Sequence, residues 1–469
     1  MSGEVDVMEG SMKRDVMEGS MRIGVIGTGH VGLITCTSLA ELGHTVVGTD
    51  ADPEKIAMLG SGRMPFFEPG VAEVMQRVLA EGRLSFSDRS ADAVAGMDVV
   101  FICVGTPPRS TGEANLAAVE QAGSAVARAA TGPLVLVEKS TVPAGTAERL
   151  QQMLGLVRPD MVDDFDVVSN PEFLREGHAM KDALEPERIL VGADSERALD
   201  AVRRVYRPLT DAGVPLIETD IKTAELAKHA CNAFLAMKIS YVNALARLCD
   251  RTGADVEAIA DVMGADARIG RAFLSAGLGY GGYCFPKDLV AFERLAAAHN
   301  YEFGLLHEVA KINDEAVSAA LQKVRDAIWN LEDKRVALFG LAFKPGTDDV
   351  RFSPSVELAR RLVAEGASVV ACDPHAAANA KAECPELELA DDPYEAARGA
   401  HCVVLGTEWP DLVSVDLARL AEVVDARVIV DARNAIDPQL ATDAGFVYHS
   451  MGRPTRRPRP SGAGQTSVR

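Results

Sequence analysis

A cysteine lies in the glycine-rich stretch GLGYGGYCFPKD, residues 277–288, and is followed by a lysine and an aspartate. Glycines let the backbone turn tightly and let a ligand approach it closely. A thiol becomes a nucleophile as the thiolate, which nearby cations such as Lys287 favour. The alternative is that Cys284 is a small buried hydrophobic residue, as free cysteines usually are. The segment therefore offers a candidate nucleophile whose role depends on the rest of the chain.

A second glycine-rich stretch, GTGHVG, directly follows an apolar run and precedes a helical pattern. Glycines at these positions permit a tight turn, close approach to a pyrophosphate and close helix–strand packing. Asp50 ends the next apolar run, where its carboxylate can accept hydrogen bonds from both ribose hydroxyls. The combination predicts dinucleotide binding, with the turn contributing Gly27, Gly29, Val31 and Gly32.

The same aspartate indicates which dinucleotide binds. The carboxylate of Asp50 would repel a 2′-phosphate, so the sequence favours NAD over NADP. Lys55 follows closely and is either a further cofactor contact or a solvated helix lysine, and the sequence alone favours the second.

Three other stretches carry side chains that suit acid–base chemistry. EKSTVP places Thr141 at a strand end, SNPEFLREG places Glu172 and Glu176 four residues apart, and ELAKHACN places Lys228 and Asn232 on one helix face. Taken singly, they are typical of a turn hydroxyl, a capping carboxylate pair and a solvated helix face. Their significance depends on whether they belong to one known pattern.

Cationic residues follow strands in the last third of the chain. FKPGTDDVR contains Lys344 and Arg351, and VDARN places Arg433 at a strand end. Cations at these positions in an acidic protein suit phosphate binding, although each one alone is more often a surface charge. The first strand-like run of this last third is followed by GLAFKPG, which lacks GxGxxG spacing. The last third of the chain should therefore bind something other than a second NAD.

Alternating strand-like and helical stretches must position these residues. The strand-like runs are continuous and β-branched, which indicates a parallel sheet covered on both faces, and therefore a doubly wound α/β domain. The expected strands of this first domain are residues 22–27, 45–50, 98–105, 133–140, 164–170 and 188–194.

A different pattern begins near residue 219. Residues 221–251 contain neither Gly nor Pro and repeat apolar residues at helical spacing, which predicts one long helix. Strand-like runs return after Lys334, so the fold class is α/β: two doubly wound Rossmann-like domains joined by a central helical domain. The expected parts are a disordered extension (1–20), an NAD-binding domain (21–212), a central helical domain (213–330), a second α/β domain (331–451) and a disordered basic tail (452–469).

Composition excludes several classes of function. A formal net charge of −20 argues against general binding of nucleic acid or anionic membranes. The 8 cysteines form no CxxC pair, so neither a disulfide framework nor a metal site is expected. No apolar run is long enough to span a bilayer and no secretory signal opens the sequence, which predicts a cytoplasmic protein.

Six motifs follow one another along the chain: GxGxVG, EKSTVP, NPEFLREG, K-x-x-x-N, GYGG-x-CFPKD and GxAFKPGTDD-x-R. They resemble the UDP-glucose/GDP-mannose dehydrogenase family, and the likeness covers residues 21 to about 450. It implies oxidation of a sugar C6 alcohol to a carboxylate with two NAD⁺ and one water. NPEFLREG favours UDP-glucose as the substrate, with GDP-mannose or a UDP-N-acetylhexosamine as the alternative.

A four-electron oxidation passes through an aldehyde, and this explains the use of a thiol. A thiolate adds to the aldehyde to form a thiohemiacetal, which loses a second hydride to become a thioester that water hydrolyses. By motif position, the resemblance implies that Cys284 is the nucleophile and that Lys228 stabilises oxyanions and the thiolate. Asp288 supports proton transfer with Lys228.

The same correspondence supplies the remaining catalytic roles. Asn232 and Thr141 position the reacting oxygen or a water, and Glu172 is the base that activates water for hydrolysis. Whether Asp288, through water, or Lys228 starts the first hydride transfer stays open. For the cofactor, the resemblance adds Thr106, Thr141, Glu176 at the nicotinamide and Arg351 at the pyrophosphate.

Substrate contacts and assembly are also implied by the resemblance. Arg268 is expected to reach the sugar nucleotide of a partner subunit, in a homodimer formed through the long helix. One departure is Tyr283, where this family commonly has a small residue, and a phenol there reshapes the pocket beside the thiol. The expected substrate-binding residues are Glu172, Phe173, Leu174, Lys228, Asn232, Arg268, Phe273, Gly281, Phe343, Lys344 and Arg433.

Overall fold

The computed structural model describes residues 19–459, so most of the expected N-terminal extension and the last ten residues of the expected tail lie outside the described residues. The chain divides into two compact units. The first unit comprises Met1–Cys231 and Val290–Tyr301, and the second comprises Asn232–Leu289 and Glu302–Arg469. The three-domain division expected from the sequence stays a prediction. No helix among residues 19–459 is long and apolar enough to cross a membrane.

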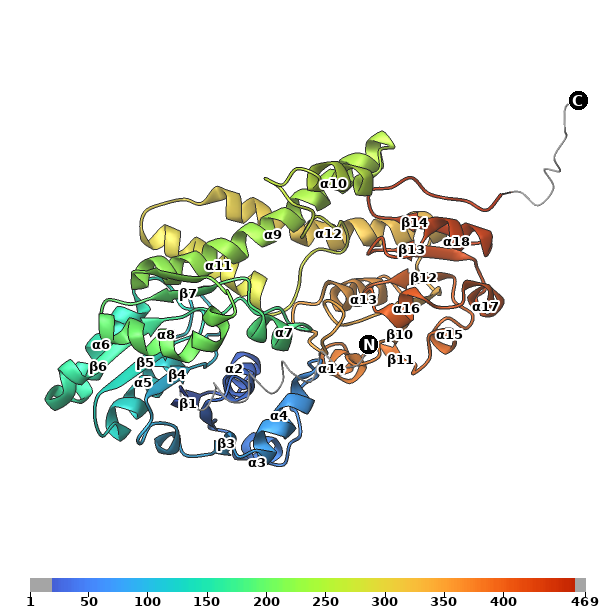
Figure 1. Ribbon diagram of the computed structural model, residues 1–469. Helices are drawn as coiled ribbons and strands as arrows, with labels where there is room; N and C mark the ends of the chain where they lie inside the picture. The colour runs from blue at the N-terminus through green and yellow to red at the C-terminus, as the bar shows by residue number, and fades with distance from the viewer. Residues whose placement is uncertain (1–18, 460–469) are drawn as a thin grey trace, which may run out of the picture. The chain divides into compact units, whose positions relative to one another are not determined.

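The first unit is built on an eight-stranded sheet (Figure 1). Its central strands are built on continuous apolar runs such as VVFI and LVLV, whose residues are all buried because helices cover both faces. From edge to edge the order is β3 (Leu84–Ser87), β2 (Thr45–Thr49), β1 (Arg22–Ile26), β4 (Val99–Ile102), β5 (Leu134–Glu138), β6 (Phe165–Ser169), β7 (Ile189–Gly192) and β8 (Leu216–Thr219).

Helices cover this sheet on both faces, as a doubly wound fold requires. One core forms between the strands and helices α2 (His30–Glu41), α3 (Pro53–Gly60), α4 (Val71–Ala80) and α8 (Glu196–Asp211). A second core forms on the opposite face with α5 (Ala117–Ala129), α6 (Thr146–Val157) and the 3₁₀ helix η3 (Pro159–Asp164). The remaining short elements are η2 (Ser90–Ala93) and α7 (Ala179–Leu184).

The direction of β7 corrects the expectation of a wholly parallel sheet. Strand β7 pairs with β6 in antiparallel fashion, at Ser169 and Gly192, while the other pairs in this sheet are parallel. A parallel connection needs a crossover that carries the chain back to the starting edge of the sheet. The connection between β6 and β7, residues 170–188, contains the six-residue helix α7 and brings the chain into β7 in the opposite direction.

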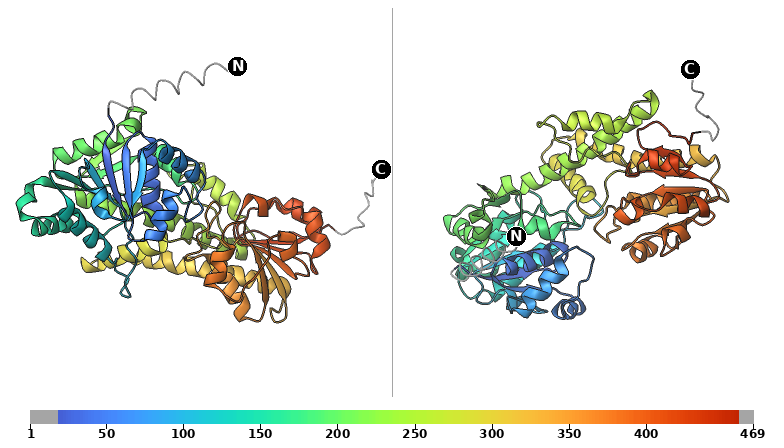
Figure 2. Two further views of the ribbon diagram at one scale, coloured as in Figure 1. Left: turned by 90° about the horizontal axis from the view of Figure 1, so that it is seen from below. Right: turned by 45° about the vertical axis from the view of Figure 1, so that its right-hand side comes forward.

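The second unit contains a six-stranded parallel sheet, shown in orange and red in Figure 2. Its strands, from edge to edge, are β11 (Glu388–Leu389), β10 (Ser368–Cys372), β9 (Arg335–Phe339), β12 (Cys402–Leu405), β13 (Val428–Asp431) and β14 (Val447–Ser450). Its helices are α10 (Val256–Gly264), α12 (Gly304–Ile328), α13 (Pro354–Ala364), α14 (Ala377–Glu383), α15 (Pro393–Ala396), α16 (Pro410–Val413), α17 (Leu417–Val423) and α18 (Pro438–Asp443).

Two helices have residues in both units. Helix α9 (Ile221–Thr252) confirms the predicted long helix, and α11 (Cys284–Ala298) begins at the candidate nucleophile. Helix α9 begins after Asp220, whose carboxylate accepts a hydrogen bond from the backbone N–H of Thr223. Without Gly or Pro, nothing in its sequence interrupts the helical hydrogen bonds.

The structure also corrects the expected start of the C-terminal tail at Gly452. Tyr448 and Arg456 exchange backbone hydrogen bonds of 2.8 and 2.9 Å, and Gly452 accepts one from the N–H of Val256. Gly452 has a φ of +66°, and a Cβ there would lie 2.5 Å from the Cα of Ala246, so a glycine allows the chain to pass close to α9. These backbone contacts hold residues that composition alone assigns to a disordered segment.

Candidate active site

The glycine-rich turn between β1 and α2 has the form that a dinucleotide requires. Gly27 has a φ of +93°, and a Cβ at Gly32 would lie 1.8 Å from the carbonyl oxygen of Gly27, so both positions demand glycine. A Cβ at Gly29, by contrast, would meet nothing within 4 Å. The backbone at Gly29 is therefore open at the N-terminus of α2, where a helix favours an anion. Val31 follows in the first turn of the helix.

Asp50 closes this turn from the end of β2. Its Oδ2 accepts hydrogen bonds from the backbone N–H and the hydroxyl of Thr28, at 2.9 and 3.1 Å, and from Lys55 Nζ at 2.9 Å. Burial alone would raise the pKa of Asp50, but the hydrogen bonds from Lys55 and Thr28 outweigh it and lower the pKa below its ordinary value. Lys55 is therefore an ion-pair partner that keeps Asp50 ionised, and not only a solvated lysine.

Glu172 and Lys228 form a buried ion pair within the first unit. Lys228 Nζ lies 3.0 Å from Glu172 Oε1, and the two side chains are only 5% and 6% exposed. The other oxygen of Glu172 accepts a hydrogen bond from the backbone N–H of Leu174. Lys228 also lies 5.2 Å from the centre of the Phe173 ring, and Arg188 stacks on that ring at 3.9 Å. Four expected site residues are thus assembled by direct contacts.

Asn232 and Asp288 form the corresponding group in the second unit. The Asn232 amide nitrogen donates to Asp288 Oδ2 at 2.6 Å, and Lys287 Nζ lies 2.7 Å from Asp288 Oδ1. Asp288 is only 1% exposed, so these contacts lie in a medium of low dielectric and are strengthened by it. Asp288 lies one turn along α11 from Cys284, and Asn232 lies one turn along α9 from Lys228.

Cys284 and Cys231 are half-buried, whereas the other six cysteines are buried. Cys284 is the first residue of α11, where the helix N-terminus favours negative charge. By contrast, burial raises the pKa of Cys103, Cys372 and Cys402 to about 12, so those thiols stay protonated at neutral pH. The two glycines before Tyr283 are needed for packing, because a Cβ at Gly281 would lie 2.4 Å from the carbonyl oxygen of Phe352.

The loop that follows β5 carries Thr141 and is held from several sides. The hydroxyl of Thr106 donates to the carbonyl oxygen of Thr141 at 2.9 Å, and His229 on α9 contacts the carbonyl oxygen of Val142 at 3.1 Å. Glu225, one turn before His229, accepts hydrogen bonds from the backbone N–H groups of Gly145 and Ala147, at 2.6 and 2.8 Å. Helix α9 therefore fixes both this loop and Lys228.

Buried charged residues at the end of β5 were missed by sequence reasoning. Glu138 is 1% exposed and accepts a hydrogen bond from the Ser140 N–H at 2.8 Å, and its second oxygen has no hydrogen-bond partner within residues 19–459. Burial raises the pKa of Glu138 to about 8 against the hydrogen bonds from Ser140, and the charge of Glu225 acts with burial. Burial likewise raises the pKa of Glu225 to about 7 against its backbone hydrogen bonds. Lys139 contacts Asn170 and Tyr206 instead.

His30, within GTGHVG, was also missed. Its Nε2 lies 2.8 Å from Glu68 Oε2, and Glu68 accepts hydrogen bonds from the backbone N–H groups of Gly177 and Ala179. Burial lowers the pKa of His30, but the hydrogen bond with Glu68 and the charge of Glu176 bring it above its ordinary value. This pair links the glycine-rich turn to the end of NPEFLREG and the residues that follow it. Two sequence features could have indicated this pair: His30 lies within the glycine fingerprint, and Glu68 lies just before a helix.

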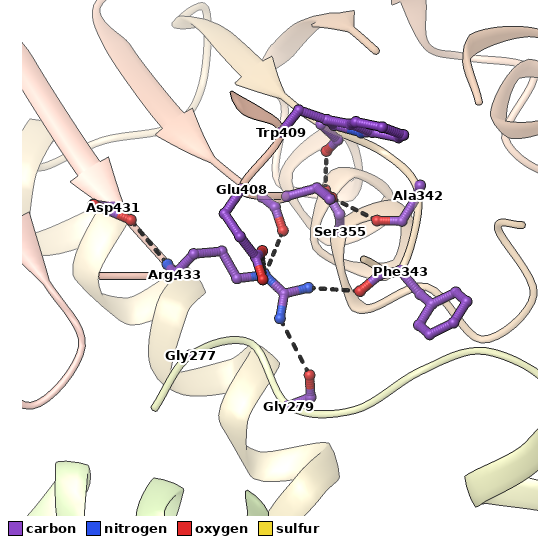
Figure 3. Close-up of polar contacts among 12 residues, drawn as sticks. Gly277, Gly279, Ala342, Phe343, Ser355, Glu408, Trp409, Asp431 and Arg433 are labelled. Carbon is purple, nitrogen blue, oxygen red and sulfur yellow. Dashed lines mark hydrogen bonds and ion pairs between the residues drawn. The ribbon is translucent and has the colours of Figure 1, made fainter. Parts of the chain in front are cut away.

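Arg433 has a structural role that its position at a strand end did not reveal (Figure 3). Its guanidinium donates to the carbonyl oxygens of Gly406 at 2.7 Å, Phe343 at 3.0 Å and Gly279 at 3.4 Å, and it lies 3.4 Å from Glu408. The side chain is 12% exposed. Arg433 therefore joins the glycine-rich segment before Cys284 to the loop that contains Phe343, and its assignment to substrate stays a prediction.

The other expected contacts are less closely grouped. Lys344 Nζ lies 5.4 Å from the ring centre of Phe343. Phe273 has a φ of +64° and its ring centre lies 6.3 Å from that of Phe285. The Arg268 side chain is 89% exposed and pairs with Asp266 in its own loop at 2.6 Å. Nothing within the described chain brings Arg268 to the residues above.

These features define a class of protein. An open glycine turn at a helix N-terminus, an ionised acid at the end of β2 and a thiol at the start of α11 fit an NAD-dependent dehydrogenase. The chain belongs to the UDP-glucose/GDP-mannose dehydrogenase family. It matches the NAD binding domain of that family over residues 21–210, the central domain over 222–315 and the UDP binding domain over 337–438.

Individual relatives agree with this assignment. The chain is 41% identical over 444 residues to UDP-glucose 6-dehydrogenase YwqF of Bacillus subtilis, covering 94% of this chain and 99% of the relative. It is 42% identical to a UDP-glucose 6-dehydrogenase of Rhizobium meliloti, covering 92% and 100%. A UDP-glucose dehydrogenase structure from Pyrobaculum islandicum aligns with a TM-score of 0.85 and 38% identity, over 93% of this chain and 98% of that one. The expected family, fold class, cofactor and enzyme class are confirmed.

The geometry at Gly29 predicts a variant that separates folding from cofactor binding. Gly29→Ala adds a methyl group in open space, so the melting temperature should stay unchanged, while NAD affinity falls at least about tenfold because the methyl group blocks the pyrophosphate. Titration of NAD and thermal unfolding test this. Gly132→Ala, also in open space in the first unit, is the control and should bind NAD normally. Normal binding by Gly29→Ala would contradict the assignment.

The carboxyl group of Glu138 predicts a pH-dependent difference in stability. A carboxyl whose pKa is raised by folding stabilises the fold fully at low pH, and this stabilisation is lost as pH rises through about 8. Glu138→Gln imitates the protonated form, so the variant should melt near the parent at about pH 4. Its melting temperature should rise above the parent's progressively between about pH 5 and pH 8, and the difference should stay constant at higher pH. Glu187→Gln, at a side chain 91% exposed, is the control. A melting difference that does not vary with pH would contradict the buried-acid interpretation.

Proposed function

We propose that this protein oxidises the C6 alcohol of UDP-glucose to the carboxylate of UDP-glucuronate, using two NAD⁺ and one water. Family membership and relatives named UDP-glucose 6-dehydrogenase support this substrate. The observation that carries the reaction type is Cys284 at the start of α11, with Asp288 one turn later held by Asn232. A two-electron alcohol oxidation needs no such thiol.

The first oxidation requires a hydride acceptor and a base. NAD, when bound, accepts the hydride from C6. Gly27, Gly29 and Asp50 would hold it in the first unit. The hydroxyl proton goes to Asp288, through water, or to Lys228, and the charge of Lys228 stabilises the developing oxyanion. The ion pair with Glu172 holds the lysine in one orientation for this role.

The second oxidation proceeds on the protein's sulfur. The Cys284 thiolate forms a C–S bond with the aldehyde carbon, and the aldehyde oxygen takes a proton to give a thiohemiacetal. Loss of a second hydride from C6, with loss of the hydroxyl proton, gives a thioester. The aldehyde therefore stays covalently bound between the two hydride transfers.

Hydrolysis completes the reaction. Glu172 takes a proton from a water molecule, which adds to the thioester carbon, and the C–S bond breaks to release the carboxylate and regenerate the thiol. Thr141 and Asn232 orient the reacting oxygen. Per sugar, two hydrides leave C6 and one water oxygen enters. Phe343, Lys344 and Arg433 are the proposed contacts of the nucleotide.

Product counting and one substitution test the proposal together. The parent should form about two NADH per UDP-glucose consumed, and Cys284→Ser should lower turnover at least about a thousandfold. Absorbance at 340 nm and mass spectrometry of the sugar nucleotide measure both. Cys384→Ser, at a buried cysteine outside the motif, is the control.

Three outcomes would contradict this reaction. One NADH per sugar indicates a two-electron oxidation. Full activity of Cys284→Ser excludes the covalent route. Faster turnover of GDP-mannose or a UDP-N-acetylhexosamine than of UDP-glucose assigns the chain to another substrate of the family.

We also propose that the protein forms a homodimer through α9. Phe234, Tyr241 and Leu248 recur at seven-residue intervals, which places them on one face of the helix, and they are 57%, 52% and 56% exposed. A row of large exposed apolar side chains is typical of an interaction surface. The exposure of Arg268 leaves it accessible to a second copy of the chain.

Charge placed on this face should separate the subunits. Phe234→Asp combined with Tyr241→Asp should convert a dimer to a monomer, as measured by light scattering after size-exclusion chromatography, because burial of two carboxylates in an apolar interface is unfavourable. Trp329→Asp, at a residue 94% exposed off this face, is the control and should remain dimeric. A parent that is monomeric at every concentration tested would refute the proposal.

A further inference from the structure

Tyr283, the residue before the candidate nucleophile, contacts two cationic side chains. The guanidinium carbon of Arg351 lies 4.6 Å from the centre of its ring, and Lys287 Nζ lies 5.7 Å from the same point. Both distances are within the range at which a cation is attracted to an aromatic face. All three residues belong to the second unit.

We propose that Tyr283 is a positioning residue that orders Arg351 for the cofactor and, through Lys287, fixes Asp288 and Asn232. The proposal rests on the proposed function, which assigns Asp288 to proton transfer, and on the family resemblance, which places Arg351 at the cofactor pyrophosphate. It gives a physical reason for an aromatic side chain at a position where a small residue is expected.

The contacts of Arg351 show why its orientation depends on the tyrosine. Its Nε and Nη2 contact the carboxylate of Asp349, at distances down to 2.6 Å, so the edge of the guanidinium is held by an acid. The ring of Tyr283 covers its face. The backbone N–H of Gly282 also donates to the carbonyl oxygen of Arg351 at 2.9 Å. The segment that carries the thiol is therefore joined to Arg351 by both backbone and side chain.

The second cation extends the same chain of contacts toward α9. Lys287 is 7% exposed and pairs with Asp288 at 2.7 Å, and Asp288 accepts the hydrogen bond from Asn232. A buried lysine whose neighbour is an aromatic face has fewer orientations available than one beside a serine. The sequence of contacts is continuous from Arg351 through Tyr283, Lys287 and Asp288 to Asn232.

The state of the phenol agrees with contacts made through the ring. Burial raises the pKa of Tyr283, while Lys287 and Arg351 act in the opposite direction and do not cancel the increase. The phenol is therefore neutral at neutral pH and attracts both cations by its π face, not as a phenolate. Serine at this position has no such face, and leucine has bulk without the quadrupole.

Three substitutions and one double-mutant cycle test the proposal. Tyr283→Phe keeps the ring and should bind NAD within about twofold of the parent. Tyr283→Leu and Tyr283→Ser remove the aromatic face and should raise the dissociation constant for NAD about three- to thirtyfold, with melting temperatures recorded for each. In an Arg351→Ala background, Tyr283→Leu should have no further effect on NAD affinity, because its effect passes through the arginine.

Each other result overturns the proposal. If Tyr283→Leu binds NAD as tightly as the parent, the contact between the ring and Arg351 does not contribute to cofactor binding. If Tyr283→Leu lowers NAD affinity equally in the parent and in Arg351→Ala, its effect is a general structural one. Normal NAD binding by Arg351→Ala removes the cofactor role on which the link depends. Because NAD binding is measured without a sugar, a parent that fails to oxidise UDP-glucose would refute the proposed function while leaving the comparison of affinities readable.

Discussion

The uninterrupted hydrogen bonding of α9 is the constraint on which the candidate site depends. Lys228 and Asn232 are one turn apart on this helix, so they are separated by about 6 Å whatever the surroundings do. Each is held by a carboxylate, Glu172 and Asp288 respectively. A proline or a glycine between them would weaken the helical hydrogen bonding and release this spacing.

The end of β5 shows how the first unit supports this helix. Consecutive side chains of a strand point to opposite faces, and here both Glu138 and Lys139 are buried and ionisable. Glu138 lies near Glu225 of α9. Lys139 contacts Asn170, which lies two residues before Glu172, and Tyr206 of α8. The strand end that leads to Thr141 is thereby fixed on both sides by polar groups that cost free energy to bury.

The sequence predicted those elements that follow from amino-acid composition and from the periodicity of apolar residues. Buried strands such as β4 and β12, the length of α9 and the glycine turn follow from local patterns. The edge strands β3, β8, β11 and β14 were not predicted, because they are short, partly exposed and lack continuous apolar runs. The direction of β7 and the course of the chain at Gly452 depend on tertiary contacts. The hydrogen-bond partners of Arg433 are distant in the sequence, so residue spacing does not predict them. Spacing also does not show that Lys55 pairs with Asp50.

The glycines at 281 and 282 restrict how this enzyme can change during evolution. A Cβ at Gly282 would lie 2.7 Å from the ring of Phe343, and one at Gly281 would meet the backbone of the next loop. Neither position tolerates divergence, so adaptation of the nucleophile's immediate surroundings must be concentrated at residue 283. Of the three residues before Cys284, only Tyr283 is therefore free of this steric limit, and its side chain sets the surroundings of the sulfur on that side.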